Sequence, residues 1–155
     1  MLHQLLAFTL GEQQYALPLA TVQRVVRMVE VTRLPSAPEV VLGVIDLQGN
    51  IIPVMSMRKR FGMVEPEASL SDQLIVANAG ARSVALVVNS VIGVVERTAE
   101  EVTETEKIVH GVQYVEGITK LKGGLLFIHD LDRFLSKKED RQLDGLLAQA
   151  AAGME

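Results

Sequence analysis

Two copies of one pattern, at residues 43–54 and 117–128, constrain how this chain can fold more than any other feature. Each copy begins with glycine, passes through an apolar-rich run to a Leu-x-Gly turn and continues into a second apolar run. Gly49-Asn50 and Gly123-Gly124 supply residues that tolerate the positive φ of a two-residue hairpin turn. The pattern therefore predicts two equivalent β-hairpins at an offset of 74 residues.

A second pair of segments repeats at nearly the same spacing. Residues 11–26 match residues 80–95 at an offset of 69. The identical pairs are Gly11/Gly80, Ala16/Ala85, Leu17/Leu86, Val22/Val91, Val25/Val94 and Val26/Val95. Two ordered blocks at similar offsets favour an internal duplication over a chance similarity of short apolar strands.

Composition restricts the class of protein. Hydrophobic residues make up 48% of the 155 residues, but there is no Trp and aromatics are 4%, so the core must consist of Val, Leu and Ile. A formal net charge of −4 argues against nucleic-acid binding, and the lack of Cys excludes disulfides and thiolate chemistry. No segment has the pattern of a signal peptide or a membrane span, so we expect a cytoplasmic protein without direct membrane insertion.

The chain in order reads mainly as strands. We expect strands at 5–10, 15–19, 22–29, 73–78 and 82–88, a short helical turn at 57–62 and a C-terminal helix or helix pair after residue 130. Val22, Val25, Val26 and Val29 also fit helical spacing. Four β-branched residues in that segment favour a strand.

The first hairpin presents a conflict of register. With Gly49-Asn50 at its tip, Leu47 faces Ile52, and Pro53 falls where the ladder needs an N–H group. The pairing must therefore bulge, stop or use a different turn. The face predicted to be buried carries Ile45, Leu47, Ile52 and Val54.

No catalytic or metal-binding pattern is present. His3, His110 and His129 are far apart in sequence and share no ligand spacing. The group His129-Asp130-x-Asp132 fits a metal or general-base pair, but a polar strand end that caps the following helix explains it more simply. We expect no catalytic residues, no metal and no cofactor.

Several motifs in order resemble the CheW family of bacterial chemosensory coupling proteins. They are Phe8 to Gly11, Tyr15 to Pro18, Val22-Gln23, Leu34 to Pro38, Gly43 to Gly49, Ile52 to Val54 and Arg58 to Gly62. The resemblance covers roughly residues 5–136. It implies an all-β fold of two intertwined five-stranded SH3/OB-like β-barrel lobes from an internal duplication, plus a short C-terminal α-helix.

The resemblance also implies a domain organisation. Residues 5–136 would form a single CheW-like domain, with the first lobe mainly 5–72 and the second mainly 73–136, and exchange of terminal strands left open. Residues 137–155 would form the C-terminal helix and tail.

The implied function is a non-catalytic scaffold. Such proteins couple the cytoplasmic tip of methyl-accepting chemoreceptors to the regulatory domain of a CheA-type histidine kinase. By resemblance, the receptor-binding groove would include Val22, Val25 and Gln48, and the kinase-binding surface would include Gly49 and Ile51. From the residues alone, Val22 and Val25 fit core positions equally well, and a single exposed Ile51 is ordinary.

Two positions depart from the family pattern. Gln48 stands where Arg is usual, and Arg24 stands where an acidic residue is usual. These changes favour an altered partner specificity, a coupling protein of a chemosensory system unrelated to motility, or a homologue that no longer couples. The alternative class is a small β-barrel that binds a ligand or an oligonucleotide, which would need stacking aromatics and basic residues on one face.

Overall fold

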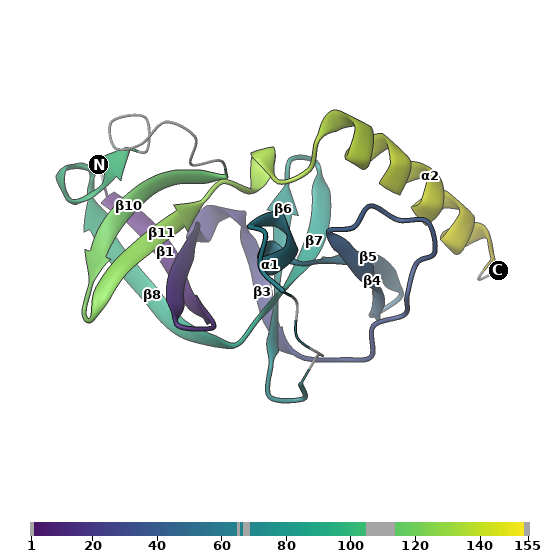
Figure 1. Cartoon of the computed structure of the whole chain (residues 1–155), viewed down its shortest axis with the longest axis horizontal. Helices are drawn as coiled ribbons and strands as arrows, with labels where there is room; N and C mark the ends of the chain where they lie inside the picture. The colour runs from purple at the N-terminus through teal and green to yellow at the C-terminus, as the bar shows by residue number, and fades with distance from the viewer. Residues whose placement is uncertain (1, 65, 67–68, 105–113, 154–155) are drawn as a thin grey trace.

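The computed structural model describes residues 2–64, 66, 69–104 and 114–153, which form two β lobes joined along a shared apolar core (Figure 1). In spatial order the six-stranded lobe contains β8 (Ser90–Thr98), β1 (Leu2–Leu10), β2 (Gln13–Pro18), β11 (Gly124–His129), β10 (Val115–Leu121) and β9 (Thr103–Glu104). The five-stranded lobe contains β3 (Val22–Arg27), β6 (Gln73–Ala79), β7 (Arg82–Val88), β5 (Asn50–Met55) and β4 (Val41–Leu47).

Five short or terminal helical segments complete the described chain. They are η1 (Leu19–Thr21), α1 (Met57–Arg60), η2 (Ala99–Glu101), η4 (Leu131–Arg133) and α2 (Lys137–Gly153). The all-β class with two intertwined lobes and a C-terminal helix is confirmed, although α2 has 17 residues and is longer than expected. His110 lies outside the described residues.

The two halves of the chain are interleaved. Strands β1 and β2 join β8 to β11 in one sheet, while β6 and β7 are inserted between β3 and β5 in the other. The first hairpin of the first half, β1–β2, therefore belongs to the lobe formed by the rest of the second half. The first hairpin of the second half, β6–β7, belongs to the lobe formed by the rest of the first half. The lobe division expected at residues 72 and 73 falls within one sheet, because β6 pairs with β3.

The repeated pattern corresponds to two hairpins with the same pairing. Gly43 pairs with Val54 and Gly117 with Ile128, and one bulge precedes each glycine at the offset of 74. The second block is equally regular at its offset of 69, since Gln23 on β3 and Ile92 on β8 are the bulged residues of their strands. Shared bulges at constant offsets confirm the internal duplication.

The glycines that begin the two hairpins are needed because another segment crosses them. Thr32 bridges to Val44 and Thr103 pairs with Ile118, and both contacts close a lobe at its open edge. A Cβ built on Gly43 would lie 2.3 Å from the Thr32 carbonyl oxygen. A Cβ on Gly117 would lie 2.8 Å from Val102 Cγ1, so both positions exclude a side chain at the closure point.

The expected tip of each hairpin is wrong by one residue, and in the second hairpin the pairing of Leu121 with Gly124 leaves Lys122 and Gly123 in the turn. Leu47 pairs with Asn50, so the turn consists of Gln48 and Gly49, with φ of 54° and 88°. When the tip moves by one residue, each residue of β4 pairs with a residue two positions away from the expected one on β5. Because side chains alternate with a period of two, the same side chains remain buried. Pro53 now lies opposite Val44 at a pair that needs no hydrogen bond, and both backbone groups of Val44 bond to Thr32 instead, at 2.8 Å each.

The core has three parts. One apolar cluster lies inside each lobe, and the largest lies between the lobes. On β1, Leu5 and Ala7 face the interior of the six-stranded lobe, whereas Leu6 and Phe8 face the shared core. The hairpins β1–β2 and β6–β7 are consequently buried on both faces, which explains their nearly continuous apolar sequence.

Candidate functional site

Four valines on two equivalent strands border the shared core. On β3, Val22 pairs with Ala77 and Val25 with Ile75. On β8, Val91 pairs with Phe8 and Val94 with Leu6. All four partners belong to the shared core, and paired residues project from the same face, so the valines continue that core toward the surface. We call Val22, Val25, Val91 and Val94 the valine seam.

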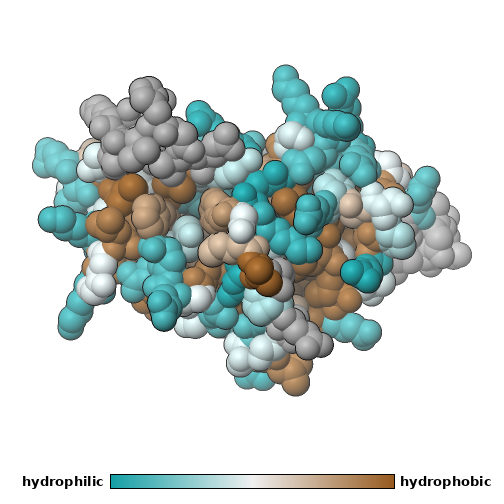
Figure 2. All heavy atoms as spheres, in the orientation of Figure 1, coloured by the Kyte–Doolittle hydropathy of each residue, from teal (hydrophilic) through white to brown (hydrophobic). Residues whose placement is uncertain are grey.

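The valine seam is only partly covered. Val22, Val25 and Val91 are half-buried, while Val94 is 56% exposed and the adjacent bulged Ile92 is 49% exposed. Both strands are terminal in the strand order of their sheets. On the face drawn in Figure 2, hydrophobic patches lie separately over each lobe with polar side chains between them. A partly exposed continuation of the core is the strongest candidate for a protein-binding surface.

The bulge on β3 is held by a side-chain network. Gln23 Nε2 donates to Asn78 Oδ1 at 2.6 Å and to Ser83 Oγ at 2.8 Å, on β6 and β7. These bonds fasten the terminal strand across two neighbours. The position of Val22 and Val25 is therefore determined by the second half of the chain.

The remaining residues expected at binding sites lie together on the β4–β5 hairpin. Gln48 and Gly49 form its exposed tip, and Ile51 is half-buried beside exposed Asp46. The Gly49 N–H donates to Asp46 Oδ1 at 2.9 Å, which braces the turn. Gln48 thus neighbours the residues expected to face the kinase. Within the described residues, no hydrogen bond or ion pair joins Gln48 to β3.

Sequence reasoning missed the half of the seam on β8. Val91 and Val94 are the duplicates of Val22 and Val25, and the identity of both pairs is visible at the offset of 69. Applying the duplication to the candidate site, and not only to the fold, would have identified them. Their exposure could not have been read from the sequence.

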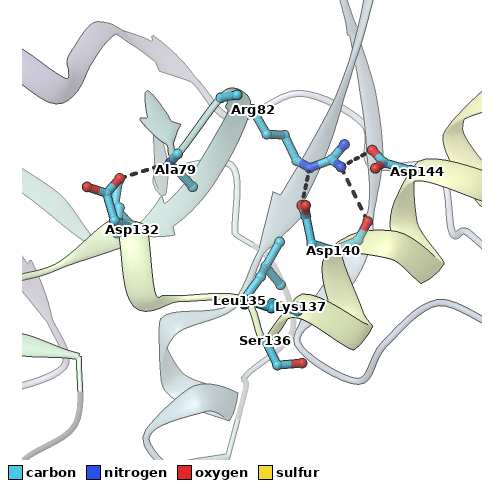
Figure 3. Close-up of a pocket in the computed structure, with 11 residues that line it drawn as sticks. Ala79, Arg82, Asp132, Leu135, Ser136, Lys137, Asp140 and Asp144 are labelled. Carbon is cyan, nitrogen blue, oxygen red and sulfur yellow. Dashed lines mark hydrogen bonds and ion pairs between the residues drawn. The ribbon is translucent and has the colours of Figure 1, made fainter.

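A cavity of about 410 Å³ lies between the β6–β7 turn and the start of α2 (Figure 3). Arg82 Nε donates to Asp140 Oδ1 at 3.0 Å, and its Nη2 pairs with Asp144. Partial burial lowers the pKa of Arg82, but the bonds to Asp144 and Asp140 outweigh burial, and the net shift is upward. The guanidinium charge is thus satisfied internally, and these contacts serve to dock α2.

A second cavity, of about 430 Å³, is lined by His3, Glu104, Glu116, Asp130 and Arg133, with apolar neighbours. Burial raises the pKa of Glu116, and repulsion from Asp130 and Asp132 adds to the effect. Asp130 caps η4 by accepting from the Asp132 N–H at 3.0 Å, as the simpler interpretation of this motif predicted. Among the described residues, no group of three or more His, Asp or Glu could hold a metal ion.

All six aromatic side chains lie in one contiguous cluster, with His129 among them. Tyr15 stacks on Phe61 with ring centroids 5.4 Å apart, and His129 lies 5.5 Å from both Phe61 and Phe134. His129 is fully buried, and burial lowers its pKa to about 3. Every Phe and Tyr side chain is buried or half-buried, so the aromatic residues are used for packing.

These features define a two-lobed β protein in which the valine seam is the candidate protein-binding surface. Residues 4–139 match the family model described as CheW-like domain, and the chain belongs to that family.

Two relatives named Chemotaxis protein CheW align with most of this chain. The one from Klebsiella aerogenes is 29% identical over 145 residues, covering 92% of this chain and 87% of the relative. The one from Thermotoga maritima is 28% identical over 134 residues, covering 86% and 88%. The crystal structure of the scaffolding protein TtCheW from Thermoanaerobacter tengcongensis superposes with a TM-score of 0.80 and 28% identity, covering 90% of this chain and 96% of that one.

In the part of the chain that the structure describes, no helix is long and apolar enough to span a bilayer.

Proposed function

We propose that this protein is a non-catalytic scaffold of a bacterial chemosensory pathway, which couples the cytoplasmic tip of methyl-accepting chemoreceptors to the regulatory domain of a CheA-type histidine kinase. It would act in the cytoplasm and reach the membrane only through its partners. Family membership supports the pathway, since the relatives are named chemotaxis proteins and the solved relative is titled a scaffolding protein.

The observation that carries the proposal is the valine seam. A receptor tip is a helical hairpin, and a helix that binds a protein surface does so through an apolar stripe. Val22, Val25, Val91 and Val94 offer an apolar strip that continues the shared core and is incompletely covered. We assign the receptor tip to this seam, which includes the two valines expected from the resemblance.

The kinase regulatory domain is assigned to the tip of the β4–β5 hairpin, at Gly49 and Ile51. The tip is exposed, braced by the bond from the Gly49 N–H to Asp46, and lies on the far edge of its sheet from β3. Gln48 lies at this same tip, so we place it nearer the kinase surface than the receptor surface. Two separate surfaces would allow both partners to bind at once.

The seam assignment is tested by Val94→Glu. Val94 is already 56% exposed, so a carboxylate there should leave the fold intact while placing a charge in an apolar interface. We expect receptor-tip binding to weaken by roughly tenfold or more, with binding to the kinase domain retained. Pull-down with purified receptor-tip and kinase fragments, alongside circular dichroism, provides the measurement.

Val64→Glu is the matched control. Val64 is 89% exposed, lies outside the seam and undergoes the same chemical change. It should bind both fragments as wild type does. Wild-type affinity of Val94→Glu for the receptor tip would reject the seam as the docking surface.

The alternative of an oligonucleotide-binding barrel is disfavoured by the aromatic cluster. Base stacking requires accessible aromatic faces, whereas the aromatic rings here pack against one another and against His129. The net charge of −4 also opposes binding to phosphates.

A further inference from the structure

The valine seam is nearly symmetric in its apolar part but not in its charges. Arg27 follows Val25 by two residues on β3, and Glu96 follows Val94 by two residues on β8. The two positions are equivalent at the offset of 69, and each pairs with a glutamine: Arg27 with Gln73 and Glu96 with Gln4. The duplication thus preserves the neighbours and reverses the charge.

Arg27 and Glu96 both project from the seam face. Strand alternation places Arg27 on the same side as Val25, and Glu96 on the same side as Val94. Both side chains are exposed. Arg27 makes no ion pair within the described residues, while Glu96 Oε1 accepts only a weak bond from Gln4 Nε2 at 3.3 Å.

The two charges lie at opposite ends of the seam. Gln73 is the cross-strand partner of Arg27, and its Oε1 accepts from the Val91 N–H at 2.8 Å, which brings the Arg27 end to the beginning of β8. Glu96 is five residues further along β8, which is about 16 Å of extended strand. The same length corresponds to about 11 residues of α-helix, or three turns.

We propose that this pair of charges fixes the direction in which a helical partner lies along the seam. A symmetric apolar strip would accept a helix in either of two opposite orientations with similar energy. A helix with an acidic residue facing Arg27 and a basic residue about three turns away facing Glu96 satisfies both charges in one orientation only.

The partner is therefore an amphipathic helix with charges of opposite sign at the two ends of its apolar stripe. This inference rests on the proposed docking function of the seam. It concerns the orientation of the partner. If helices bind the seam without regard to their charge, the orientation inference fails while the docking function stands.

The experiment uses the full chain and three synthetic capped helical peptides with one shared Leu stripe. Each peptide carries two charged residues 11 positions apart, and the pair is Glu and Lys, Glu and Glu, or Lys and Lys. Binding is measured by fluorescence anisotropy at low and high salt. Wild type should bind Glu/Lys roughly threefold to tenfold more tightly than the other two, and salt should reduce that difference. Arg27→Glu should make Lys/Lys the preferred peptide. Combining it with Glu96→Arg should restore the preference for Glu/Lys.

Arg33→Glu is the matched control, because Arg33 is exposed outside the seam and the net charge changes equally. It should keep the wild-type ranking. An unchanged ranking in Arg27→Glu, or the same change of ranking in Arg33→Glu, would overturn the orientation inference. Failure of all three peptides to bind wild type would overturn the docking function of the seam and the orientation with it. Circular dichroism of each variant verifies folding.

Discussion

The two halves of the chain have the same backbone plan and different side-chain chemistry at equivalent points. Met55 ends β5 and His129 ends β11, 74 residues apart, and both are 0% exposed. Met55 packs in the shared core, whereas His129 lies against Phe61 and Phe134 with no hydrogen-bond partner for either ring nitrogen within the described residues. Equivalent backbone positions thus carry an apolar side chain in one half and a titratable one in the other.

The comparison shows which features the duplication had to keep. Hairpin pairing, bulges and the closure glycines are the same in both halves because each lobe can close only with that backbone geometry. Side chains such as Met55/His129 and Arg27/Glu96 diverged because the backbone does not depend on them. Substitutions at three pairs of equivalent positions test where the two halves must be alike and where they differ.

The largest effect is expected at the closure glycines. In Gly43→Ala the new Cβ meets the Thr32 backbone carbonyl, which cannot move without opening the lobe, and we expect about 3 kcal/mol of destabilisation. In Gly117→Ala the nearest atom is Val102 Cγ1, which can shift, and about 1 kcal/mol is expected. Urea unfolding measures both. Gly124→Ala, with no atom within 4 Å of its Cβ, is the control, and equal losses at Gly43 and Gly117 would show that the closures do not differ.

The next effect concerns acid stability. Burial lowers the pKa of His129 to about 3, while the unfolded chain takes up a proton near 6.5. The unfolded state therefore binds more protons below pH 6.5, so stability is complete above that pH and falls as the pH drops toward 3. From this residue we expect about 2 kcal/mol less stability at pH 5 than at pH 7.

His129→Met makes this position like its duplicate and should remove that loss. Urea unfolding at pH 7 and pH 5 compares it with wild type and with His3→Met, which replaces a partly exposed histidine and should behave as wild type does. If His129→Met retains the full acid-induced loss, the buried imidazole is not its source.

The smallest effect is at the hairpin tips. Gln48 has φ of 54°, which costs a non-glycine residue about 1–2 kcal/mol, whereas Lys122 is not among the residues with positive φ. Gln48→Gly should stabilise the fold by about 0.5 kcal/mol, because relief of strain exceeds the added chain entropy. Lys122→Gly should destabilise it by about 0.5 kcal/mol. Opposite signs in thermal unfolding test the difference, and equal signs would contradict it.

The sequence alone determined the features that depend on local geometry. The duplication, the two hairpins, the strand at Val22–Arg27 and the helical turn at Met57–Arg60 follow from strand periodicity and from glycine in turns. The assignment of Val22 and Val25 to the candidate site came from the family resemblance. Their duplicates, Val91 and Val94, were already visible in the sequence repeat.

The tertiary structure decided the features that depend on contacts between distant residues. The hairpins of the two halves exchange lobes, which no local pattern encodes because both arrangements use the same strands. The first turn begins at Gln48, despite its positive φ, because that register pairs Val44 with Thr32 and leaves Pro53 where no hydrogen bond is needed. The exposure of Val94, and the placement of Arg27 and Glu96 at opposite ends of the seam, arise because two interleaved sheets meet along one core.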